Sequence, residues 1–195
     1  MFCIRRATVI INARLLSVRS LSSVSAMNRA IYFQSNGHPA SALSAISYPA
    51  LPPPAASAVN LKVLLSPINP SDINVVQGVY PVQPPPIVFT VPGSKDELTG
   101  HVPGNEGLGQ VEEVGSDVES LSKGDWVIFA KKQAGTWSSG LSVLEQEVVK
   151  VPKLPGLTDV NAATLSVRFW LLFFRLVEFT RHLFDRLIPL RLITC

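Results

Sequence analysis

The residues best suited to chemistry lie in one polar stretch, 66–74, and in the tyrosine that follows it. This stretch predicts a short helix capped by Asn69 or Ser71 and ended by Gly78. Tyr80 then falls in a loop, where a phenol can donate a proton to a reacting substrate. The same pattern also fits a packed tyrosine beside an ordinary turn, and these residues alone do not decide between the two interpretations.

Several other chemistries lack their residues. The sequence has neither glycine-rich phosphate-binding motif, GxGxxG or GxxxxGK[ST], and no GxSxG nucleophile motif. Its histidines, His38, His101 and His182, are far apart and have no metal-ligand spacing. Cys3 and Cys195 lie at opposite ends, which excludes a disulfide framework and a cysteine zinc site. We therefore expect no bound metal.

Composition and charge limit the class of protein. The chain has 195 residues, of which 47% are hydrophobic and 16% charged, as in a globular domain. The formal net charge of +3 hides an uneven distribution, because residues 30–167 carry seven lysines against twelve acidic residues. The arginines lie in 1–29 and 168–195. A nucleic-acid groove needs cations on the folded body, so we expect no nucleic-acid partner.

The two ends differ in character from the middle. Residues 1–29 are rich in arginine and serine and contain no acid, which is typical of a mitochondrial transit peptide. A disordered basic tail is the alternative. Residues 168–195 are rich in Leu, Phe and Arg, and their longest charge-free run is too short for a membrane span. They fit an amphipathic surface helix or a segment with no evolved fold.

The middle of the chain predicts a mainly β fold. Short apolar or alternating segments separated by glycine turns indicate a small antiparallel barrel or sandwich. The expected strands are 30–34, 59–65, 108–114, 126–129 and 147–151. Thr158 or Asp159 is expected to cap a helix that continues through 161–165.

Six motifs in a fixed order carry a resemblance to a known family. They are SPINPSDIN, QGVYP, VPGNEGLGQVEEVGSDV, KGDWVIFA, GTW and NAATLSV, and the resemblance that they carry extends from about Ala30 to Val167. This part resembles the N-terminal half of the mitochondrial trans-2-enoyl-thioester reductases, in the medium-chain dehydrogenase/reductase superfamily. The insertion at 93–95 is similar to that of the fungal members. The resemblance implies a GroES-like partly open barrel.

The resemblance also implies a reaction and its residues. The family reduces trans-2-enoyl thioesters of CoA or acyl-carrier protein with NADPH, in fatty-acid synthesis in the mitochondrial matrix. Hydride addition at the β-carbon leaves an enolate, and a phenol, with an ordinary pKa of about 10, can protonate its α-carbon. Tyr80 matches the family's proton donor. Asn69 matches an asparagine beside the nicotinamide or is a turn cap, and Trp137 lines the acyl side or packs in the core.

The sequence departs from its relatives in two places. Zinc-dependent members carry Gly-His-Glu where this chain has Gly104, Asn105 and Glu106, so metal-assisted alcohol oxidation is not expected. The resemblance stops at Val167, before the Rossmann domain of the family, so we expect no cofactor-binding residues within this chain.

We therefore expect 30–167 to be an incomplete GroES-like domain with exposed strand edges, poor stability and no independent activity. Full-length relatives are homodimers, and we do not expect a dimer here. Two alternatives stay open: a non-catalytic GroES-like interaction fragment and an NADPH quinone oxidoreductase of the same superfamily.

Overall fold

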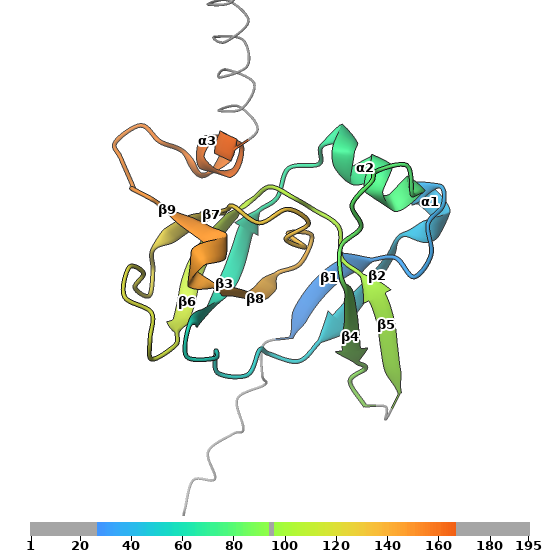
Figure 1. Cartoon of the computed structure of the whole chain (residues 1–195), viewed down its shortest axis with the longest axis horizontal. Coiled ribbons are helices and arrows are strands. Elements are labelled where there is room, and N and C mark those ends of the chain that lie inside the picture. The colour runs from blue at the N-terminus through green and yellow to red at the C-terminus, as the bar shows by residue number, and fades with distance from the viewer. Residues whose placement is uncertain (1–26, 94–95, 167–195) are drawn as a thin grey trace, which may run out of the picture.

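The computed structural model describes residues 27–93 and 96–166, arranged as one five-stranded sheet, two two-stranded sheets and short helices (Figure 1). The predicted transit peptide lies outside the described residues except for 27–29, and the predicted tail 168–195 lies wholly outside them. The mainly β fold predicted from the sequence is confirmed.

The five-stranded sheet is antiparallel throughout and has the order β8-β3-β6-β7-β9. Its strands are β3 (Ala58–Leu65), β6 (Leu108–Val114), β7 (Trp126–Phe129), β8 (Gly140–Leu144) and β9 (Val148–Val151). Alternate residues of these strands point inward, as the two-residue period of a strand requires. Val59, Leu61 and Val127 are fully buried and form the main core with their neighbours. Removing these apolar side chains from water stabilises the sheet.

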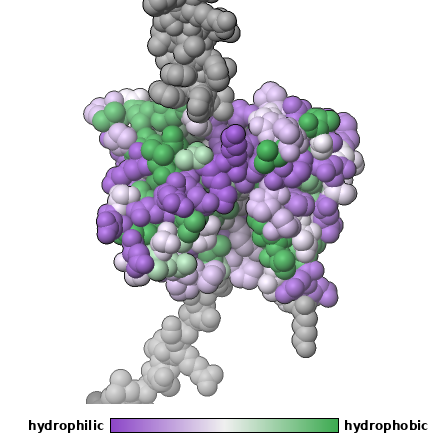
Figure 2. All heavy atoms as spheres, in the orientation of Figure 1, coloured by the Kyte–Doolittle hydropathy of each residue, from purple (hydrophilic) through white to green (hydrophobic). Residues whose placement is uncertain are grey.

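Two hairpins stand beside this sheet. One pairs β1 (Asn28–Tyr32) with β2 (Ser44–Tyr48), and the other pairs β4 (Pro86–Thr90) with β5 (Glu97–His101). Tyr32, Tyr48 and Phe89 form an aromatic cluster that joins the hairpins. On the face shown in Figure 2, hydrophobic side chains gather over the β4–β5 hairpin, where Val88 is 56% exposed.

The helices are short. They are α1 (Pro39–Ala42), α2 (Pro70–Gln77), α3 (Asp159–Ala163) and the 3-10 helix η1 (Glu145–Glu147). Figure 1 places α1 and α2 together at one end of the molecule, above the β1–β2 hairpin. No helix in the described part of the chain is long and apolar enough to cross a membrane.

The predicted strands agree with the structure to different degrees. The strand at 126–129 is correct to the residue, and those at 59–65 and 108–114 correspond to β3 and β6. The strand expected at 30–34 begins two residues earlier, because β1 pairs from Asn28 onward with β2. The sequence patterns did not reveal β2, β4, β5 or β8. Three of them lack a continuous apolar run, whereas β4 has the short run 87–89 directly after the prolines 84–86.

Candidate active site

The candidate site begins at α2, which the cap residues define as the sequence predicted. Asn69 occupies the N-cap position, and its backbone N–H donates to Asp72 Oδ2 at 2.9 Å. Gly78 ends the helix with φ +79°, a conformation that only glycine adopts without strain. A Cβ on Gly78 would also lie 2.9 Å from Asn36. The chain therefore leaves the helix at Gly78.

Tyr80 lies just beyond this stop and is half-buried. Its backbone N–H donates to the Asn74 carbonyl at 3.1 Å, which fixes the start of the loop. Its side chain packs against a buried cluster of Phe33, Val75 and Val76. Both sequence-based interpretations of Tyr80, the packed side chain and the proton donor, are compatible with a ring that is anchored on one face only.

Asn69 caps α2 in a capping box with Asp72, whose carboxylate accepts from the Asn69 backbone N–H. The amide Nδ2 of Asn69 also donates to Glu106 Oε2 at 3.1 Å, across to the loop between β5 and β6. The structure thus fits the role of turn cap, one of the two interpretations of Asn69, and the place beside the nicotinamide stays a prediction. The Asn69 amide group faces the polar network of the candidate site.

Asp72 is fully buried and joins the same network. Its Oδ1 accepts from the backbone N–H of Asn105 at 3.2 Å and from the Asn105 amide at 3.0 Å. Asn105 Oδ1 in turn accepts from the backbone N–H of Gln133 at 2.7 Å. Asn105, which stands where zinc-dependent relatives have a histidine, is therefore held by hydrogen bonds at both ends of its amide.

A second set of hydroxyl groups surrounds the Glu106 backbone. Its carbonyl oxygen accepts from Ser66 Oγ at 3.1 Å and from Thr136 Oγ1 at 2.8 Å. The two hydroxyl oxygens are also 2.8 Å apart, and since each hydroxyl has one proton, one of them can donate to the other while the other donates to the carbonyl. Buried polar groups need such partners, and this set ties the end of β3 to the loop that carries Trp137.

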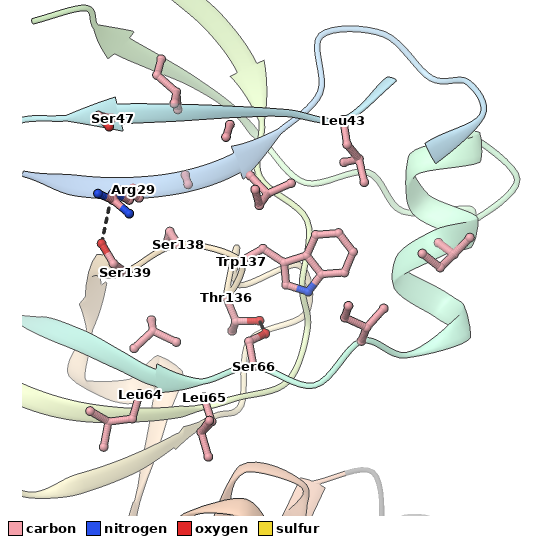
Figure 3. Close-up of a pocket in the computed structure, with 17 residues that line it drawn as sticks. Arg29, Leu43, Ser47, Leu64, Leu65, Ser66, Thr136, Trp137, Ser138 and Ser139 are labelled. Carbon is pink, nitrogen blue, oxygen red and sulfur yellow. Dashed lines mark hydrogen bonds between the residues drawn. The ribbon is translucent and has the colours of Figure 1, made fainter. Parts of the chain in front are cut away.

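Trp137 lines a cavity of about 1050 Å³ between the β1–β2 hairpin and the end of β3 (Figure 3). The walls are mostly apolar and include Leu43, Leu65, Ile68 and Ile73. In Figure 3 the indole projects across the cavity toward α2. Its Nε1–H is buried and has no hydrogen-bond partner among the described residues. Trp137 thus offers an unused donor at an apolar cavity.

The predicted site residues lie in the same region but not in one cavity. Asn69 follows Ile68, which lines the cavity, but neither Asn69 nor Tyr80 lines it. Leu43 is the link, because it lines the cavity beside Trp137 and also packs in the cluster of Tyr80. The structure therefore places Trp137 on one side of Leu43 and Tyr80 on the other.

Tyr48 is a second half-buried tyrosine near the β1–β2 hairpin. Its phenol donates to the Gly140 carbonyl at 2.7 Å, and burial raises its pKa above the ordinary value. A tyrosine whose proton is already engaged with a backbone carbonyl is a poorer proton donor than one at a loop edge. Within 27–93 and 96–166, no group of three His, Cys, Asp or Glu side chains could hold a metal ion.

Sequence reasoning missed the roles of Asp72, Glu106, Ser66 and Thr136 in this network. The sequence motifs indicated no partner for Asp72 and placed Glu106 only beside Asn105. Glu106 is 3% exposed, and the available signal was a charged residue in a turn that also contains Gly104 and Gly107.

Comparison with known proteins decides the family. Residues 55–153 match the alcohol dehydrogenase GroES-like domain. The chain belongs to this family. The chain is 40% identical over 157 residues to the mitochondrial enoyl-[acyl-carrier-protein] reductase of Schizosaccharomyces pombe, covering 77% of this chain and 40% of that protein. It is 38% identical over 166 residues to the rat enzyme, covering 83% of this chain and 40% of the rat protein.

Solved structures agree. A mutant form of the enoyl thioester reductase from Candida tropicalis superposes with a TM-score of 0.62 at 35% identity, covering 73% of this chain and 41% of that one. An Escherichia coli quinone oxidoreductase in complex with NADPH has a TM-score of 0.53 at 25% identity. The superposition covers 70% of this chain and 36% of that one. The predicted resemblance to mitochondrial enoyl-thioester reductases is confirmed. The chain spans about 40% of the length of the curated relatives it matches.

Proposed function

We propose that residues 30–167 form the substrate side of an NADPH-dependent reductase of trans-2-enoyl thioesters. The observation that carries this proposal is the 35–36% identity to an enoyl thioester reductase that has been solved with NADP and crotonyl-CoA. Curated relatives from fungi, animals and a plant support it, because all carry the name mitochondrial enoyl-[acyl-carrier-protein] reductase. The alternative function, quinone reduction, has weaker support, because the E. coli quinone oxidoreductase has a lower identity to this chain and a lower TM-score than the enoyl thioester reductase.

Tyr80 is the proton donor in this proposal. When bound, NADPH would supply a hydride to the β-carbon of the enoyl group, which would leave an enolate on the thioester. The Tyr80 O–H then protonates the α-carbon, which gives the saturated thioester, NADP⁺ and a tyrosinate that regains its proton from solvent. The loop after Gly78 presents this phenol, while the packing of its ring on Val75 and Val76 restricts its motion.

Asn69 and Trp137 are the binding residues in this proposal. Asn69 lies at the start of α2, where its amide Nδ2 donates to Glu106 at 3.1 Å, and its role in this proposal is to shape the substrate side of the site next to the nicotinamide. Trp137 lines an apolar cavity of about 1050 Å³, which suits the acyl chain of the thioester. The unused Nε1–H of Trp137 suits a carbonyl of the same substrate.

We infer a mitochondrial location from the names of the relatives and from the composition of residues 1–29, which we assign as the transit peptide. The matrix is the compartment proposed, with enoyl-CoA or enoyl-acyl-carrier protein as substrate in fatty-acid synthesis. Residues 168–195 have no role in this proposal.

A chimera tests the function, because the chain spans only part of its relatives. Residues 30–167 replace the matching part of the S. pombe reductase, and NADPH oxidation is followed with crotonyl-CoA and, separately, with a benzoquinone. We expect turnover of crotonyl-CoA and a loss of kcat by about 10²–10⁴ in Tyr80→Phe, the usual contribution of a general acid.

Tyr32→Phe is the matched control, because Tyr32 is buried in the aromatic cluster of the hairpins. It should leave kcat near that of the unsubstituted chimera. Equal rates in Tyr80→Phe and Tyr32→Phe would remove Tyr80 from the mechanism, and turnover of the quinone alone would favour the second candidate. A folded chimera without either activity would favour a non-catalytic fragment.

A further inference from the structure

Thr136 and Trp137 stand in the cavity wall on one loop, 133–137, which is bound to the loop 103–106 between β5 and β6 (Figure 3). Backbone N–H groups of the first loop donate to carbonyls of the second: those of Gly135 and Thr136 to Gly104, at 2.9 and 3.2 Å, and that of Trp137 to Pro103, at 3.1 Å. These bonds make 133–137 follow the position of 103–106. The place of Trp137 therefore depends on how the two loops are held.

Asn105 is the member of 103–106 whose side chain binds in two directions. Its amide Nδ2 donates to Asp72 Oδ1 of α2 at 3.0 Å, and its Oδ1 accepts from the backbone N–H of Gln133 at 2.7 Å. A carboxylate oxygen accepts and a backbone N–H donates, so a reversed amide would lose both bonds, and chemistry fixes the orientation of the Asn105 side chain. Asn105 therefore ties α2 to the start of 133–137.

Gln133 is held in a conformation that its residue type disfavours. Its φ is +55°, in the left-handed region, and among the described residues it is the only one other than glycine with a positive φ. Its side chain is buried, and neither Oε1 nor Nε2 has a hydrogen-bond partner among those residues. A left-handed backbone and a buried amide without partners both cost free energy, so surrounding contacts must hold Gln133 in place. The bond to Asn105 is such a contact.

We propose that Asn105 is a positioning residue for the cavity, because it holds Gln133 in the left-handed conformation and thereby sets the place of Trp137 in the cavity wall. Without this bond Gln133 can return to a negative φ, which redirects the chain that leads to Trp137. Only the identity of the ligand rests on the proposed function. In the reductase the cavity takes the acyl chain, so Asn105 affects the binding of long acyl chains more than that of short ones.

Fluorine NMR of the 195-residue chain, labelled with fluorotryptophan, reports on the surroundings of Trp137 directly. Trp137→Phe assigns its signal, and Trp126 in β7, outside both loops, is the internal control. Asn105→Ala removes both side-chain bonds of the asparagine. Asn105→Asp keeps an acceptor for the Gln133 N–H but sets two carboxylates against each other at Asp72. The two variants therefore separate the bond to the loop from the bond to the helix.

We expect the Trp137 signal to move or broaden in Asn105→Ala and to keep its wild-type position in Asn105→Asp, while the Trp126 signal stays in place in both. Both variants should melt at a lower temperature than the wild type, because each loses the side-chain bond to Asp72. A purely structural role would make the Trp137 signal follow the loss of stability. An unchanged signal in Asn105→Ala, or equal shifts in the two variants, would overturn the proposal.

Activity of the reductase chimera gives a second measurement. Asn105→Ala should raise KM for trans-2-dodecenoyl-CoA by about tenfold, the factor expected when about two CH₂ groups lose their burial. The increase for crotonyl-CoA should be smaller, because its short chain reaches less of the cavity. Equal increases for the two substrates would overturn the link to the acyl chain. An inactive chimera would refute the proposed function, while the NMR result would still decide the role of Asn105.

A double variant covers the case in which Asn105→Ala does not fold because the buried Asp72 carboxylate loses one of its donors. Asp72→Asn removes that buried charge, and its amide oxygen can still accept from the Asn69 backbone N–H. Asn105→Ala in this background still lacks the bond to Gln133. The Trp137 signal should therefore move from its position in Asp72→Asn alone, and an unchanged position would overturn the proposal.

Discussion

Replacing Gly104 with alanine is the most direct test of the packing around Trp137. Gly104 has φ +105°, which side chains rarely adopt. A Cβ at this position would overlap Thr136 Oγ1 and lie 2.6 Å from Trp137 Cδ1 and 2.9 Å from the Trp137 backbone nitrogen. Two of these three atoms belong to side chains fixed by hydrogen bonds or by packing, and the third is backbone, so the site cannot relax cheaply.

The expected loss of stability has two parts. A non-glycine residue in this backbone region costs about 1–3 kcal/mol. Overpacking against rigid neighbours adds about 1–3 kcal/mol. The sum, about 2–6 kcal/mol, is a large fraction of the roughly 5–15 kcal/mol that stabilises an ordinary domain.

Gly124→Ala is the matched control, because Gly124 has φ +92° and a Cβ there would meet nothing within 4 Å. This variant carries the backbone cost alone. Urea unfolding of both variants, followed by Trp fluorescence, should show Gly104→Ala to be the less stable by about 1–3 kcal/mol, the overpacking part. Equal losses in the two variants would refute the steric argument for Gly104.

Three further outcomes follow from the core and from the perturbed titrations. Leu61→Ala, at a fully buried position, should cost about 2–5 kcal/mol in urea unfolding, whereas Leu144→Ala, at a position 39% exposed, should cost clearly less. Burial raises the pKa of Tyr48, so the contribution of Tyr48 to stability is complete below pH 10.0 and is lost as the pH rises above that value. Tyr48→Phe should therefore reduce the loss of stability at alkaline pH, measured by urea unfolding at a series of pH values. The pKa of Asp125 is lowered, first by its bond to Lys150 at 2.6 Å, so its contribution is present above pH 3.8 and is lost as the pH falls below it. Asp125→Asn should weaken the acid dependence below pH 3.8, by no more than the roughly 0–1 kcal/mol of an exposed ion pair.

Local signals in the sequence were sufficient where the structure itself is local. The helix α2 was predicted from its N-cap asparagine and its terminal glycine, and both occupy those positions. The helix α3 is capped by Thr158, one of the two residues expected, whose hydroxyl accepts from Asn161 at 3.2 Å. In each case a few neighbouring residues satisfy the free N–H groups of the helix end, which a single sequence can reveal.

Contacts between distant residues could not be predicted in the same way. β8 contains Gly140 and Ser142 and becomes a strand because β3 pairs with it. The bond from Asn69 to Glu106 likewise joins two segments whose proximity depends on the fold. The family resemblance directed attention to Asn69, Tyr80 and Trp137, but the hydrogen bond between Asn69 and Glu106 became visible only in three dimensions.

The position of β3 in the sheet has a consequence during synthesis. β3 lies between β6 and β8, and its first residue, Ala58, pairs with Leu144. A growing chain translated at roughly 5–20 residues per second needs about 4–16 seconds after Leu65 before Leu144 has been added. During that interval one edge of β3 has no partner, and Val59 and Leu61 are available to chaperones that bind apolar segments. Completion of β8 is therefore the step at which β3 can first be paired along both edges, and β9 is added to the sheet after it.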